Sequence, residues 1–120
     1  MTLHDLSVDE LLTALGAKTP TPGGGAVAPL VAGLATALGR MVLAYSVDKP
    51  SLSEHRAGNE DAMHRLLDLQ QQAMQCAEDD ATAYAELNTL MKLPKDDPRR
   101  TGAWTRTVEG AMEPPRRTLE

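Results

Sequence analysis

The 120-residue chain contains no isoleucine and no phenylalanine, and its only aromatic side chains are Tyr45, Tyr84 and Trp104. Only six valines represent the β-branched apolar residues. Because β-strands favour Val, Ile, Tyr, Phe and Trp, this composition argues strongly against an all-β fold. Ala and Leu, with 17 copies each, are good helix formers, so the fold is predicted to be all-α. The length corresponds to a single domain, residues 1–120.

The chain also lacks an excess of basic residues, since 12 Lys and Arg face 17 Asp and Glu and leave a net charge of −5. A nucleic-acid partner is therefore not expected. The one cysteine, Cys76, cannot form an internal disulfide, and no group of Cys and His has the spacing of a metal site. With no secretory signal at its N-terminus, the protein is expected to be cytoplasmic and to hold no metal.

Charge is nearly absent from residues 26–47, where Arg40 is the only charged side chain. Such a stretch is long enough to span a bilayer. However, it is rich in Ala, Gly and Thr rather than in Leu, Ile and Phe, and Arg40 would be costly inside a membrane. We therefore expect a helix buried on most sides within a helical protein, and no membrane partner.

Start and stop signals predict four helices. The first helix follows Ser7, which forms a capping box with Glu10, and it ends near Gly16. The predicted ranges of the other three are 26–47, 53–91 and 99–112.

Glycine and proline are expected to limit these helices. Gly58 is a candidate break near the start of the third helix, and Pro114 and Pro115 are expected to stop the fourth. Pro115 would also suit the first position of a further helix.

A loop rich in proline and glycine, residues 17–25, joins the first two predicted helices. Its three glycines, Gly23, Gly24 and Gly25, formally fit a loose dinucleotide-binding fingerprint, but no strand precedes them as that motif requires. Glycines before a helix leave backbone N–H groups exposed at its positive end, which suits an anionic ligand group. The alternative is that these glycines only permit close helix packing.

Asp80 lies beside the apolar stripe of the third predicted helix, whereas Asp79 points the other way. A carboxylate in such surroundings has a raised pKa unless it is paired, and such groups are often functional. The alternative is a solvated or ion-paired carboxylate at the boundary of the core. Three lysines, Lys49, Lys92 and Lys95, could hold the carboxylates of an acidic ligand, although lysines near helix ends are usually plain surface groups.

Two sequence blocks, in this order, resemble a known family. The first is Lys18-Thr19-Pro20-Thr21-Pro22-Gly23-Gly24-Gly25-Ala26. The second is Glu78-Asp79-Asp80-Ala81-x-Ala83-Tyr84, followed by Met91-Lys92-Leu93-Pro94-Lys95. They are similar to the cyclodeaminase/cyclohydrolase family, which comprises the C-terminal domain type of formiminotransferase-cyclodeaminase and stand-alone methenyltetrahydrofolate cyclohydrolases. The resemblance covers nearly the whole chain.

The resemblance implies an all-helical bundle with a long central helix that forms homodimers and binds a reduced folate, which can be polyglutamylated. It implies hydrolysis of 5,10-methenyltetrahydrofolate to 10-formyltetrahydrofolate or cyclodeamination of 5-formiminotetrahydrofolate, and it does not choose between them. Asp80 is the implied catalytic carboxylate, and no cofactor is needed beyond the folate substrate. The implied substrate-binding residues are Pro22, Gly23, Gly24, Gly25, Lys49, Tyr84, Lys92 and Lys95.

The sequence departs from the family pattern in three places. Ala26 stands where the family commonly has Ser, and Pro114-Pro115 stands where a Val-Pro begins another helix. Family domains usually continue through several more helices, so the chain is expected to be shortened at its C-terminus. These departures leave an alternative open, namely a non-catalytic or degenerate helical dimer that binds folate or is purely structural.

Overall fold

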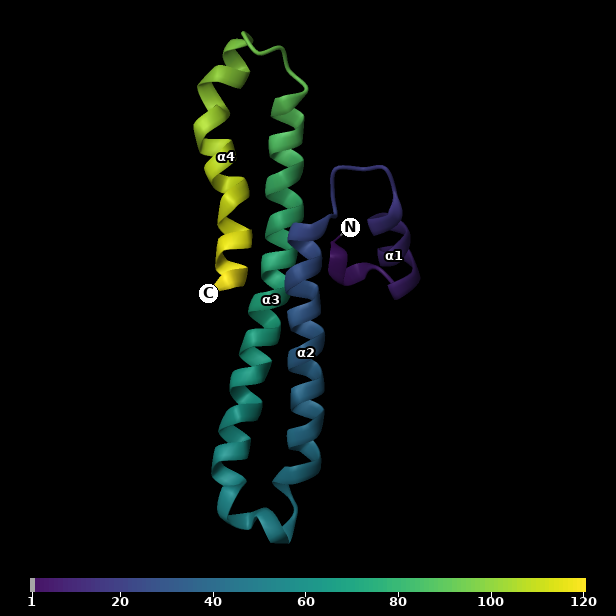
Figure 1. The fold of residues 1–120 in the computed structure, drawn as a ribbon, viewed down its shortest axis with the longest axis vertical. Helices are drawn as coiled ribbons and strands as arrows, with labels where there is room; N and C mark the ends of the chain where they lie inside the picture. Colours follow the sequence, from purple (N-terminus) through teal and green to yellow (C-terminus); the bar gives the residue numbers. More distant parts are fainter. Residues whose placement is uncertain (1) are drawn as a thin grey trace.

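In the computed structural model, which describes residues 2–120, the chain is built from four α-helices (Figure 1). They are α1 (Val8–Gly16), α2 (Gly24–Val47), α3 (Arg56–Met91) and α4 (Pro98–Leu119), with short 3₁₀ helices η1 (Leu3–Asp5) and η2 (Pro50–His55). No strand is present in the described part of the chain, which confirms the all-α prediction.

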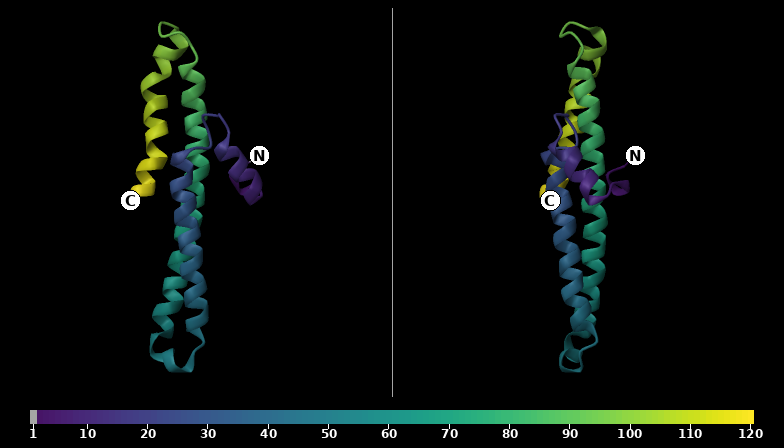
Figure 2. Two further views of the ribbon diagram at one scale, coloured as in Figure 1. Left: turned by 45° about the vertical axis from the view of Figure 1, so that its right-hand side comes forward. Right: turned by 90° about the vertical axis from the view of Figure 1, so that its right-hand side faces the viewer.

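The long helix α3 is the element on which the rest of the fold is arranged. Helix α2 runs antiparallel along its first part, and α4 folds back along its second part (Figure 1). The result is an elongated molecule with a radius of gyration of 19.0 Å, where a compact domain of this length would have about 14 Å. Helix α1 lies to one side of this three-helix body (Figure 1 and the left view of Figure 2).

The capping box predicted at α1 is present. The Ser7 hydroxyl accepts a hydrogen bond from the Glu10 N–H at 3.2 Å, and the Glu10 carboxylate accepts one from the Ser7 N–H at 2.7 Å. Helix α1 therefore begins where the sequence predicts.

Small residues bring α2 and α3 close together, as the sequence suggests. A Cβ built on Gly33 would lie 3.6 Å from the Met74 sulfur, and one built on Gly39 would lie 3.1 Å from a Leu66 methyl carbon. The single charge of α2 is also satisfied across this contact, since Arg40 donates to the Gln70 side chain at 2.9 Å.

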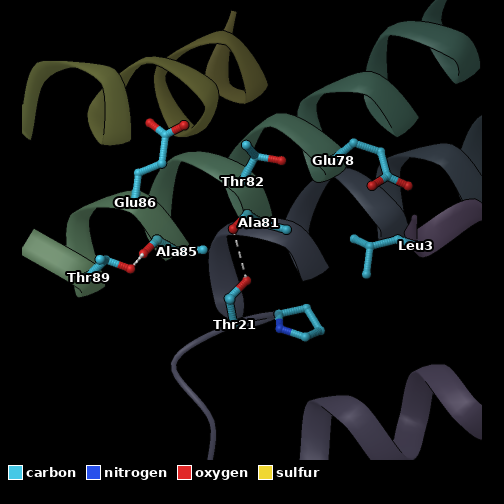
Figure 3. A pocket seen from close by; sticks show the side chains of 9 residues that line it. Leu3, Thr21, Glu78, Ala81, Thr82, Ala85, Glu86 and Thr89 are labelled. Carbon is cyan, nitrogen blue, oxygen red and sulfur yellow. Dashed lines mark hydrogen bonds between the residues drawn. The ribbon is translucent and has the colours of Figure 1, made fainter. Parts of the chain in front are cut away.

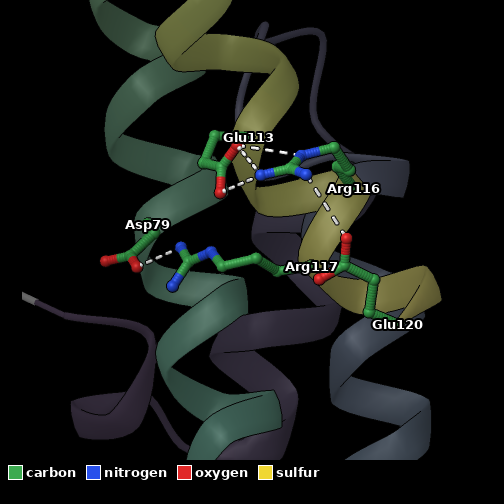
Figure 4. Close-up of polar contacts among 5 residues, drawn as sticks. All are labelled: Asp79, Glu113, Arg116, Arg117 and Glu120. Carbon is green, nitrogen blue, oxygen red and sulfur yellow. Dashed lines mark hydrogen bonds and ion pairs between the residues drawn. The ribbon is translucent and has the colours of Figure 1, made fainter.

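The predicted stop at Pro114 and Pro115 is wrong, because α4 continues through both prolines to Leu119. The physical reason lies on the side that faces α3. Pro114 is buried, and Arg117, one turn beyond it, donates to Asp79 of α3 at 2.6 Å (Figure 4). Proline has no backbone N–H, so Pro114 and Pro115 cannot form their helix hydrogen bonds. The packing of Pro114 and the ion pair of Arg117 keep the helix continuous there.

Two smaller boundary predictions also differ from the structure. Gly58 does not break the third helix, which starts at Arg56. Residues 53–55, the first part of the predicted helix, belong to the 3₁₀ helix η2 instead. Helix α2 starts at Gly24, two residues earlier than predicted, because the glycines themselves form its first turn.

Two glycines provide a matched test of the α2–α3 contact. Gly39→Leu is expected to lower the free energy of unfolding by about 1–3 kcal/mol, because the new side chain overpacks the space that Leu66 fills. Gly58→Leu is expected to raise it by up to about 1 kcal/mol, because nothing lies within 4 Å of a Cβ there and leucine favours helix. Urea denaturation measures both, and equal effects at the two sites would contradict the packing described.

Candidate functional site

The candidate site lies where the N-terminus of α2 meets the middle of α3. Asp80, on α3, is only 7% exposed. A Cβ built on Gly25 would overlap its carboxylate and lie 2.6 Å from Cγ. Only glycine allows this approach, so the glycine loop and Asp80, which are 55 positions apart, form one structural unit.

The Asp80 carboxylate has no counter-charge. Among residues 2–120 it takes part in no ion pair, and no side chain donates a hydrogen bond to it, whereas its neighbour Asp79 is paired with Arg117. Burial raises the pKa of Asp80 above its ordinary value of 3.8. The hydrogen bond from Arg117 lowers the pKa of Asp79 instead. The pKa values of the two adjacent aspartates are therefore shifted in opposite directions. Ionisation of Asp80 lowers the stability of the fold, whereas ionisation of Asp79 does not.

A cavity of about 490 Å³ opens beside Asp80. Its volume is in the usual range for a small-molecule site. Among residues 2–120, Asp80 and Tyr84 supply the only polar side chains in its wall, and the rest is glycine and apolar side chain. The lining residues are Pro20, Gly23, Gly24, Gly25, Asp80, Tyr84, Leu87, Val108, Ala111, Met112 and Pro115. A buried carboxylate in a wall without a cation is suited to a ligand that is apolar and carries positive charge.

The first turn of α2 adds backbone donors at one edge of this cavity. The N–H groups of Ala26 and Val27 both donate to the Gly23 carbonyl at 3.0 Å. The N–H groups of Gly24 and Gly25 precede them at the helix end, where backbone donors have no partner within the helix. This edge is therefore suited to oxygen or nitrogen acceptors of a ligand.

The structure brings together Gly23, Gly24, Gly25, Asp80 and Tyr84 from the residues proposed on sequence. Pro22 lies on a neighbouring groove of about 520 Å³ between α3 and the N-terminal segment (Figure 3). There the Thr21 hydroxyl donates to the Ala81 carbonyl at 3.3 Å, and Glu78 accepts from the His4 N–H at 2.9 Å. The first contact holds the loop before the glycines on α3, and the second holds η1 on α3.

The three lysines do not line the Asp80 cavity within one chain. Lys92 and Lys95 lie at the end of α3 and in the following loop, and Lys92 is about 18 Å along the helix axis from Asp80. Lys49 follows the opposite end of α2, about 36 Å along that helix from Gly25. All three are exposed.

The wall supplied by α4 is a part of the site that sequence reasoning missed. Val108, Ala111, Met112 and Pro115 face Asp80 from α4. Their spacing continues the apolar face that begins at Trp104, so the pattern was present in the sequence. The predicted helix over residues 99–112 already contains three of these residues, and only Pro115 lies beyond the expected stop.

Comparisons with known proteins identify the family of the chain. A family model described as Formiminotransferase-cyclodeaminase matches residues 7–120. A formimidoyltransferase-cyclodeaminase from Gallus gallus is 30% identical over 106 residues, which cover 85% of this chain and 20% of the chicken protein. The chain thus spans about a fifth of the length of this curated relative. No solved structure matches the chain.

The contact between Gly25 and Asp80 can be tested with two alanine variants. Gly25→Ala is expected to lower the free energy of unfolding by about 1–3 kcal/mol, because its Cβ overlaps the Asp80 carboxylate. Gly24→Ala is the control, since nothing lies within 4 Å of a Cβ at that position, and it is expected to change stability by less than about 0.5 kcal/mol. Thermal or urea unfolding of the two variants distinguishes them, and a neutral Gly25→Ala would contradict the geometry.

Proposed function

The chain belongs to the formiminotransferase-cyclodeaminase family, and we propose that it is a folate enzyme whose reacting centre is the Asp80 cavity. The observation that carries this proposal is the buried, unpaired carboxylate of Asp80 in a wall that holds no cation. A bridged folate such as 5,10-methenyltetrahydrofolate is a flat, largely apolar cation at its reacting carbon. It would supply the positive charge that the cavity lacks.

The proposed hydrolysis uses Asp80 first to stabilise the cation and then to move a proton. A water molecule attacks the bridging carbon, and Asp80 accepts one proton from it. The carbon–N5 bond then breaks as the carbonyl of the formyl group forms. The proton on Asp80 passes to N5, and the second proton of the water leaves to solvent. The product is 10-formyltetrahydrofolate, and Asp80 is regenerated as the carboxylate.

The second candidate reaction, cyclodeamination of 5-formiminotetrahydrofolate, reaches the same cation from the other side. N10 attacks the formimino carbon, and the departing nitrogen takes up protons to leave as ammonia. The Asp80 carboxylate stabilises the bridged cation that forms. The raised pKa of Asp80 favours proton transfer in both reactions, because the group can hold a proton closer to neutral pH.

The remaining residues of the site suit other parts of a folate. We propose that the free N–H groups at the start of α2 bind polar atoms of the ring system, and that Tyr84, one turn from Asp80, lies along the ligand. A glutamate tail that follows α3 toward its C-terminal end would reach Lys92 and Lys95, whose cations suit its carboxylates.

Asp80→Asn tests the proposal. The variant is expected to reduce hydrolysis of methenyltetrahydrofolate by about 10²–10⁴-fold, because an amide neither carries the negative charge nor accepts the proton. The loss of near-ultraviolet absorbance of the substrate measures the rate. The matched control is Asp79→Asn, one residue away on the Arg117 side of α3, which is expected to keep most of the activity.

Two outcomes would contradict the assignment. Equal rates for the wild type and Asp80→Asn would remove Asp80 from the chemistry. Tight binding of a reduced folate with no turnover by the wild type, measured by calorimetry, would favour a non-catalytic folate-binding protein. The non-catalytic alternative is supported by Ala26, which stands where the family commonly has Ser. Ala26 is fully buried beside the glycine turn and has no hydroxyl to offer a ligand.

A further inference from the structure

Thr21 connects the glycine loop to α3 from outside the Asp80 cavity. Its hydroxyl donates a hydrogen bond to the Ala81 carbonyl at 3.3 Å (Figure 3). Thr21 lines the neighbouring groove, whereas Asp80, the residue before Ala81, lines the cavity. Within residues 2–120 this is the one hydrogen bond that joins the loop of residues 17–23 to α3. A contact made in one groove thus holds a loop whose glycines line the other cavity.

The Ala81 carbonyl can accept this hydrogen bond without loss to its own helix. A backbone carbonyl has two lone pairs, and Ala81 lies inside the continuous helix α3, where one of them accepts from the N–H four residues on. The Thr21 hydroxyl uses the other. Removal of this hydroxyl therefore leaves the carbonyl paired, and α3 is expected to remain intact without it.

Two contacts on consecutive residues of α3 enclose the glycines. Thr21 is bound to Ala81, and Gly25 lies directly against the Asp80 carboxylate. Only three residues separate the two attached positions, and two of these three are glycines. The attachments at both ends therefore limit the conformations that the segment between them can adopt.

This limit matters because a segment with two glycines has more backbone freedom to lose than other sequences. Fixing such a backbone costs conformational entropy, which opposes either folding or ligand binding, depending on when the segment becomes ordered. With both ends attached, the segment is ordered on folding. The N–H groups of Gly24 and Gly25, which have no partner within the helix, are then already oriented when a ligand arrives.

We propose that Thr21 is a positioning residue for ligand binding, a step that rests on the proposed function. Its hydrogen bond keeps the N–H groups of Gly24 and Gly25 at a fixed place relative to the Asp80 carboxylate. Acceptor atoms of the folate ring can then bind these N–H groups while the cationic carbon of the same ligand lies at Asp80. Thr21 itself contacts neither the ligand nor the reacting atoms.

Thr21→Val tests the proposal, because valine keeps the shape of threonine and lacks the hydroxyl. The KM for 5,10-methenyltetrahydrofolate is expected to rise about 3–10-fold, which is the effect of one net hydrogen bond. The kcat is expected to stay within about 2-fold of the wild-type value, because Asp80 is unchanged and the lost interaction serves binding. Initial rates from the near-ultraviolet absorbance of the substrate give both constants.

Two further variants separate the hydroxyl from the rest of the side chain. Thr21→Ser retains the donor and is expected to bring the KM back to within about 2-fold of the wild-type value. Thr19→Val makes the matched exchange at an exposed threonine two positions earlier, whose hydroxyl bonds to nothing in residues 2–120. It is expected to leave both constants unchanged. Equal urea midpoints of all variants would show that the change in KM is not a loss of folding.

The mobility of the loop gives a second readout that needs no folate. Nuclear magnetic resonance relaxation reports an order parameter for each backbone N–H, about 0.85 where the backbone is rigid and below about 0.6 where it is flexible. The order parameters of Gly23 and Gly24 are expected to fall in Thr21→Val. They are expected to keep their wild-type values in Thr21→Ser and Thr19→Val.

Three kinetic results would overturn the positioning role: a wild-type KM in Thr21→Val, a loss of kcat at unchanged KM, and failure of Thr21→Ser to restore the KM. Unchanged order parameters in Thr21→Val would also overturn it. Failure of the folate assignment would look different, because the wild type would then show no turnover or Asp80→Asn would keep the wild-type rate. In that case the order parameters would still show whether the Thr21 hydroxyl holds the loop.

Discussion

The carboxylate of Asp80 lies so close to Gly25 that any larger residue there would displace either the side chain or the start of α2. This contact fixes where α2 begins to pack on α3, and it places an acidic group with 7% exposure at the end of a helix. Glycine is needed because the two groups must approach closely, and its backbone angles are ordinary, since no glycine in the described residues has a positive φ. The rest of the site is arranged around this contact.

The neighbouring elements keep Asp80 unpaired. Arg117 of α4 is bound to Asp79 and is not available to Asp80 (Figure 4). The apolar side of α4 covers the cavity instead, with Val108, Ala111 and Met112 in its wall. An uncompensated buried charge lowers stability, and such a group persists where it serves binding or chemistry. The fold thus holds an unpaired, buried carboxylate at the cost of some stability.

The sequence predicted the helical class, the capping box at Ser7 and the meeting of the glycine loop with Asp80, because each depends on local chemistry or on a recognisable motif. Helix periodicity placed Asp80 beside the apolar face, and the structure confirms its burial. The path of α4 was not predictable in the same way. Pro114 and Pro115 weaken a helix locally, and only burial of Pro114 and the pairing of Arg117 with Asp79 across 38 positions keep it intact. Those forces are tertiary and have no local signal.

The lysines show a different limit. The helix predicted over residues 26–47 already places the glycine loop and Lys49 at opposite ends, yet the resemblance implied that both bind the substrate. The structure shows that none of Lys49, Lys92 and Lys95 lines the Asp80 cavity within one chain. A motif can name residues of one family without showing how far apart they lie in the fold.

The most direct test of the account is the titration of the Asp80 carboxyl by carbon-detected nuclear magnetic resonance. Asp79 serves as the internal reference on the same helix. In the free protein Asp80 is expected to titrate above 3.8 and Asp79 below it, because one carboxylate is buried without a partner and the other accepts from Arg117. Addition of a cationic bridged folate is expected to lower the pKa of Asp80. An Asp80 that titrates at or below 3.8 without ligand would contradict the claim that it is an unpaired, buried carboxylate.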